Sequence, residues 1–195
     1  MKKLLLPLLL VTPLVAQNFE VGLNLSRQYY QSAFELPGPL HLQPQDKTVV
    51  AGRFGYSIVD LGPALFQLTA VYQPKVDTDV KVNAGAGTRG TLGHEYWGVG
   101  AMFNFKALMA VGAGIDYRSE KLSSYGFSTT YGRPWARINV GYAFPAPLVK
   151  PFFGIEVAAP LVVKKDHTVV FEDREDELKI LAPKLQIGIY GGIRF

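Results

Sequence analysis

The chain has 195 residues, of which 48% are hydrophobic and 18% charged, and it contains no cysteine. This composition excludes a disordered chain, and the length favours one domain. The lack of cysteine excludes disulfides and a lipid-anchored cysteine, and a formal net charge of +4 is too small to indicate nucleic-acid binding.

Residues 1–16 are typical of a secretory signal peptide. Lys2 and Lys3 form a short basic start, and an apolar run follows as far as Ala16. The run is too short for a transmembrane helix, which needs about 20 apolar residues. The alternative is a buried N-terminal helix, which Pro7 and Pro13 disfavour. We expect cleavage after Ala16 and a single domain over residues 17–195.

Eight segments of the mature chain alternate in character with a period of two. In each, one face is apolar and the other is mostly glycine or polar, which predicts β-strands with two unlike faces. The segments cover residues 19–26, 48–59, 64–73, 94–105, 109–118, 134–144, 153–161 and 185–195.

The connections between these segments alternate strictly between long and short. Long polar stretches cover residues 29–46, 75–93, 119–131 and 164–177. Short turns lie at residues 60–63, near Lys106 and at residues 145–147. Short periplasmic turns and long outer loops are typical of outer-membrane barrels. The pattern places both chain ends on the periplasmic side.

The predicted fold is all-β: an eight-stranded antiparallel up-and-down transmembrane β-barrel after a signal peptide, in the bacterial outer membrane. Eight continuous apolar faces need lipid, and strands in lipid must close so that every backbone group is paired. The alternative is a soluble lipocalin-like barrel, which would point its large apolar residues inward. Here the second face is Gly, Asn, Gln, Ser and Arg, which suits a narrow, crowded lumen.

Aromatic residues near the strand ends predict two interfacial girdles. Those at the loop ends are Tyr72, Trp97 and Tyr117, and those at the turn ends are Phe19, Phe105, Phe144 and Phe195.

The last predicted strand carries a family resemblance. Tyr190, Ile193 and the terminal Phe195 lie where the final strands of outer-membrane barrels carry aromatic or apolar residues. With its eight-strand pattern, the mature chain resembles the small OmpA-barrel, OmpX and opacity-protein group of Gram-negative bacteria. The resemblance implies that these three residues form an assembly signal for the barrel-assembly machinery. It also implies contact with outer-membrane lipids and lipopolysaccharide, and we expect a monomer.

Strand parity places seven charged side chains in the lumen: Glu20, Arg53, Asp116, Arg118, Arg137, Glu156 and Arg194. Since an unpaired buried charge is costly, we expect two ion pairs, Arg137–Glu156 across a turn and Glu20–Arg194 across the closing seam. Arg53 lies near mid-strand and can reach Glu156 across the lumen. Two interpretations remain open: a packed polar plug, or a narrow path gated by rearranged pairs.

Catalytic motifs are weak, and we expect neither an enzyme nor a cofactor. Residues 85–90 match GxGxxG, but a strand follows where a nucleotide site needs a helix. His94-Glu95 lacks the second histidine of a zinc protease.

The fourth polar stretch contains Glu172, Asp173, Glu175 and Asp176. These are a solvated loop tip or, alternatively, weak ligands for a divalent cation, although the glycine-turn spacing of a calcium loop is missing.

Two functions follow from this pattern. The first is a non-enzymatic outer-membrane barrel that contributes to membrane structure or to surface interaction through four outer loops. The alternative is a narrow porin or small-solute channel through the lumen.

Overall fold

A computed structural model describes residues 19–30, 34–35, 41–82, 89–124, 126–162, 179 and 181–195. The predicted signal peptide and residues 163–178 lie outside these ranges. The strands are β1 (Phe19–Tyr29), β2 (Phe34–Glu35), β3 (His41–Pro44), β4 (Lys47–Asp60), β5 (Ala64–Val82), β6 (Arg89–Lys106), β7 (Ala110–Ser124), β8 (Phe127–Ala143), β9 (Lys150–Pro160) and β10 (Leu185–Arg194).

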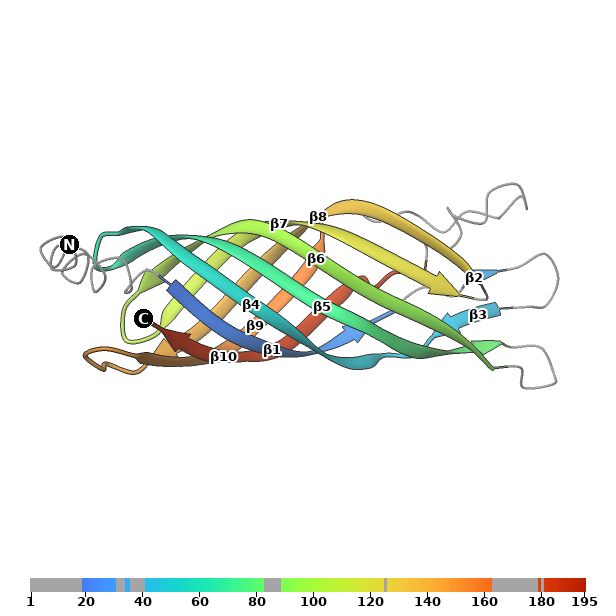
Figure 1. The fold of residues 1–195 in the computed structure, drawn as a ribbon, viewed down its shortest axis with the longest axis horizontal. Coiled ribbons are helices and arrows are strands. Elements are labelled where there is room, and N and C mark those ends of the chain that lie inside the picture. Colours follow the sequence, from blue (N-terminus) through green and yellow to red (C-terminus); the bar gives the residue numbers. More distant parts are fainter. Residues whose placement is uncertain are drawn as a thin grey trace, which may run out of the picture.

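Eight of these strands close into a tilted antiparallel barrel (Figure 1). The order around the wall is β1-β4-β5-β6-β7-β8-β9-β10, and β10 pairs with β1 from Glu20↔Arg194 to Tyr29↔Leu185. Two backbone hydrogen bonds between Phe19 and Phe195, of 3.0 and 2.9 Å, complete the seam. The described wall therefore has no open edge, as a strand in lipid requires.

The two faces of the wall agree with the sequence pattern. Apolar side chains such as Leu23, Val99 and Ile155 are exposed on the outside, while polar ones such as Gln67 and Asn139 are buried inside. The prediction of an all-β, eight-stranded barrel is confirmed. In the described part of the chain, no helix is long and apolar enough to cross a membrane.

The predicted long loops at residues 75–93 and 119–131 are wrong in large part, because both are mostly strand. β5 and β6 have 19 and 18 residues, and β7 and β8 have 15 and 17, against 11 in β1 and 10 in β10. These two hairpins extend beyond β1, β9 and β10 at the end opposite both termini, where β2 and β3 also lie (Figure 1). Residues 41–44, also predicted as loop, form β3, which pairs with the end of β5.

The physical reason is that the two faces of the strands exchange polarity at the girdle formed by Tyr72, Trp97 and Tyr117. Below it, large apolar residues such as Val99 and Ile115 face outward to lipid. Above it, β6 and β7 point Leu92 and Leu122 inward and Lys121 outward, as a water-exposed strand does. The polar residues that suggested loops are the solvent face of two hairpins.

A small apolar cluster fills the outer mouth of the barrel. It consists of Tyr30, Val80, Leu92, Leu122, Leu181 and Ala182. Leu181 and Ala182 come from the segment before β10, which Arg133 holds by donating a hydrogen bond to the Pro183 carbonyl at 2.7 Å. The lumen is therefore covered at its outer end by packed side chains.

Candidate functional site

The lumen is the part of the molecule where chemistry-bearing side chains gather. The described residues bury four carboxylates and four guanidiniums, so the charges balance: Glu20, Asp116, Glu120 and Glu156 against Arg53, Arg118, Arg133 and Arg137. Since successive side chains of a strand point to opposite faces, each strand contributes an inward side chain at every second position. The glycines between these residues leave room in a narrow eight-stranded section.

Glu20 organises the end of the lumen at which both termini lie. Its Oε2 accepts hydrogen bonds from Arg194 Nη2 at 2.8 Å and Gln67 Nε2 at 3.0 Å. Arg53 Nε lies 3.3 Å from Oε1. The structure thus brings Glu20 and Arg194 together across the seam where their strands pair.

Glu156 lies at mid-height and faces Arg53 across the lumen. Arg53 Nη1 donates to Glu156 Oε2 at 3.0 Å, and Asn24 Nδ2 donates to Oε1 at 3.0 Å. The Arg53 guanidinium also lies 4.7 Å from the centroid of the Tyr190 ring. One guanidinium therefore bridges the carboxylates of Glu20 and Glu156.

Arg137 does not lie directly opposite Glu156, as the expected cross-strand pair requires. The β8–β9 register sets Arg137 against Ala158 and Asn139 against Glu156, a displacement of two residues. Arg137 Nε lies 3.1 Å from Asp116 Oδ2 but 4.0 Å from Glu156 Oε2. The prediction took the turn to be centred between Pro145 and Pro147, and the register expected from that centre is wrong by two residues.

Asp116 and Arg118 link the middle of the lumen to its outer third. Arg118 Nη2 lies 3.4 Å from Asp116 Oδ2, and its Nη1 donates to Gln186 Oε1 at 2.8 Å. Its guanidinium lies 4.2 Å from the Trp135 ring and 4.6 Å from the Tyr96 ring. A cation over an aromatic face is stabilised without a second carboxylate.

Glu120 forms the densest group in the lumen, and the sequence prediction missed it. Arg133 donates to both carboxylate oxygens at 2.7 and 2.8 Å, and Trp135 Nε1 donates at 2.6 Å. His94 Nε2 lies 3.2 Å from the same carboxylate. The predicted loop at residues 119–131 includes Glu120, but the inward parity of Asp116 and Arg118, continued by two residues, also points Glu120 into the lumen.

A cavity of about 60 Å³ lies among these groups near the end with both termini, lined by Glu20, Arg53, Asn139, Tyr190 and Arg194 among others. It is small against the 300–1,000 Å³ that ligand pockets generally have. The described part of the lumen is filled mainly by side chains.

The remaining predicted residues belong to the proposed assembly signal in the last strand and to the acidic group of the fourth polar stretch. Tyr190 points inward and is buried, whereas Ile193 on β10 and Phe195 just after it are exposed. An assembly signal in this strand stays a prediction. The acidic group from Glu172 to Asp176 lies outside the described residues, and within the described ranges no three His, Asp or Glu side chains gather to hold a metal ion.

Comparison with known proteins identifies the fold. No protein-family model and no curated protein matches the chain. Among solved structures, the outer membrane protein OprG from Pseudomonas aeruginosa is similar, with a TM-score of 0.54 over 92% of this chain and 94% of that one. Since the identity is 10%, the likeness shows the fold alone. The chain has the fold of a small eight-stranded outer-membrane barrel.

Proposed function

We propose that the protein is a non-enzymatic barrel of the bacterial outer membrane. A solid polar plug fills its lumen, and its outer hairpins form the surface for interactions. The observation that carries the proposal is the balanced set of four buried carboxylates and four buried guanidiniums across the section. Removing one partner of a buried ion pair is strongly unfavourable. A solute could cross only by breaking several of these pairs together.

The cluster at the outer mouth adds to this support. Leu92, Leu122 and Leu181 are buried above the polar network, so a passing ion would also meet an apolar layer. The Arg133 hydrogen bond to the Pro183 carbonyl ties this layer to the Glu120 group. Two consecutive layers of opposite character suit a closed scaffold.

A narrow channel is the second candidate. The cavity beside Arg53 and Glu20 favours it, as do ion pairs that join different strands and could exchange partners. In that case Glu156, which Arg53 and Arg137 both approach, would be the gating carboxylate.

Single-channel conductance in a planar bilayer tests the proposal. We expect the wild type and Glu156→Ala to be equally silent, because the Glu120–Arg133 group and the apolar mouth still block the section above Glu156. Glu95→Ala, which removes a carboxylate from the outer surface, is the matched control. A wild-type conductance that Glu156→Ala changes and Glu95→Ala leaves alone would establish the channel instead.

A further inference from the structure

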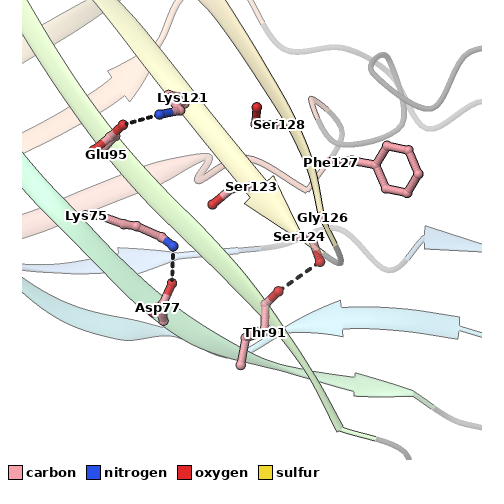
Figure 2. A pocket seen from close by; sticks show the side chains of 10 residues that line it. All are labelled: Lys75, Asp77, Thr91, Glu95, Lys121, Ser123, Ser124, Gly126, Phe127 and Ser128. Atoms are coloured by element: carbon pink, nitrogen blue, oxygen red, sulfur yellow. Dashed lines mark hydrogen bonds and ion pairs between the residues drawn. The ribbon is translucent and has the colours of Figure 1, made fainter.

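A polar hollow lies on the outer wall of the β5–β6–β7–β8 extension, away from the lumen. It has a volume of about 410 Å³, and its lining includes Lys75, Asp77, Glu95, Lys121 and Ser123. Figure 2 shows the lysines and carboxylates as two ion pairs, Lys75–Asp77 and Glu95–Lys121, on three neighbouring strands. Nothing in the plug described above uses these residues.

The strand register explains how the hollow forms. Pro74 cannot donate a ladder hydrogen bond, and the β5–β6 pairing shifts between Gln73 and Val76. This irregularity turns Lys75 outward beside Glu95, which pairs with Lys121 on the other side. The result is a row of alternating sign across three strands.

The next row contains a gap. Asp77 pairs with Gly93, and Gly93 pairs with Ser123, so a bare glycine separates two polar side chains. A Cβ on Gly93 would collide with the Lys75 side chain and would lie 2.5 Å from Ser123 Oγ and 2.8 Å from Asp77 Oδ1. The absence of a side chain at Gly93 lets the lysine and the carboxylate meet over the floor of the hollow.

The height of the hollow relative to the membrane narrows the choice of ligand. The exposed aromatics Tyr72, Trp97 and Tyr117 lie directly below it on the same three strands. Glu95 is two residues beyond Trp97, about 7 Å along the strand. The polar layer on each side of the hydrocarbon core is about 5–8 Å thick. The Lys75–Glu95–Lys121 row therefore lies at the depth of the outer-leaflet headgroups.

The charges suit a ligand that carries phosphates beside hydroxyl groups. Lys75 and Lys121 are about half exposed, and their pairs with Asp77 at 3.4 Å and Glu95 at 3.1 Å are exposed pairs of the weak kind. Phosphate oxygens can accept from the lysines, and sugar hydroxyls can donate to the freed carboxylates. A purely anionic headgroup would leave Asp77 and Glu95 facing like charge.

From the hollow, its depth and its alternating charges, we infer that it binds the phosphorylated saccharide headgroup of an outer-leaflet glycolipid, whose acyl chains lie against the aromatics below. The inference rests on the proposed placement of this barrel in the outer membrane. It does not depend on whether the lumen conducts.

The test measures binding of diphosphorylated lipid A to the full chain in nanodiscs, by native mass spectrometry. Lys75→Gln with Lys121→Gln should weaken binding at least about tenfold, because two charge-assisted contacts are lost. The matched control is Lys106→Gln with Lys150→Gln, which removes the same charge at the periplasmic end and should leave binding unchanged.

Two further ligands make the outcome decisive. Dephosphorylated lipid A should bind the wild type as weakly as the double variant binds lipid A, and phosphatidylglycerol should not distinguish the two variants. The inference would be overturned if both double variants bound lipid A as the wild type does, or if both lost binding to the same extent. Unheated gel mobility confirms that each variant is a folded barrel, and the single lysine variants replace any double variant that is not. A conducting lumen would refute the plug and leave this result untouched.

Discussion

Replacing Glu120 by Gln is expected to lower the free energy of unfolding by about 3–5 kcal/mol, the typical cost of breaking a buried ion pair by removing one partner. Glu120 is fully buried and accepts two hydrogen bonds from Arg133 and one from Trp135. Glutamine keeps the volume but leaves the guanidinium without its counter-charge. Urea titration in detergent micelles measures the change, with the mobility of unheated samples on a gel as the readout of folding.

Two variants separate this effect from a general loss of charge. Glu95→Gln breaks an exposed pair with Lys121, the residue next to Glu120 on β7, and should cost at most about 1 kcal/mol. Arg133→Met added to Glu120→Gln should recover part of the loss, because no charge then stays unpaired in the lumen. If Glu120→Gln and Glu95→Gln destabilise equally, the outer third of the lumen is not held by this pair.

Valine in place of Gly100 is expected to prevent the barrel from folding, with a cost of at least about 3 kcal/mol from overpacking and a disrupted buried pair. Gly100 faces the lumen, and a Cβ there would collide with Asp116 Oδ1 and the Ile115 carbonyl and lie 2.7 Å from Asp116 Cα. Asp116 is the carboxylate that lies 3.1 Å from Arg137. The yield of the heat-modifiable form after refolding into micelles measures the effect.

Gly52→Val is the matched control, because Gly52 lies between Val50 and Phe54 on the lipid-facing side of β4. The nearest atom to an added Cβ there is the Tyr72 carbonyl oxygen at 3.8 Å. This variant should fold as well as the wild type, since an apolar side chain on that face contacts lipid. Equal refolding yields for both valine variants would contradict the crowded lumen on which the plug depends.

The sequence alone predicted the eight strands and the face that each presents to lipid. A period of two needs no tertiary information, because each strand carries it locally, as the alternation of Ile187 and Ile189 with Gln186 and Gly188 shows. The seam register, with Glu20 opposite Arg194, also followed from topology, because both strands end at the same side of the membrane.

The loop predictions failed where the strands leave the lipid and enter water. The sequence pattern predicts a loop at Lys121 and Ser123 because it is interpreted with lipid outside every strand. Beyond the girdle water replaces lipid, so the same alternation places Leu92 and Leu122 inside and the polar residues outside. The girdle aromatics Tyr72, Trp97 and Tyr117 mark the boundary in the sequence, but the prediction ended the strands there instead of continuing them with the opposite polarity.

The partners of the lumen charges were decided by the tertiary structure. Parity alone put Arg137, Asp116 and Glu156 inside the barrel, but the β8–β9 register differs by two residues from the expected one, and Arg137 lies nearer to Asp116. Which inward charges meet depends on how far each strand is displaced against its neighbours around the closed wall. That displacement is a property of the whole barrel, so no single segment of the sequence could specify it.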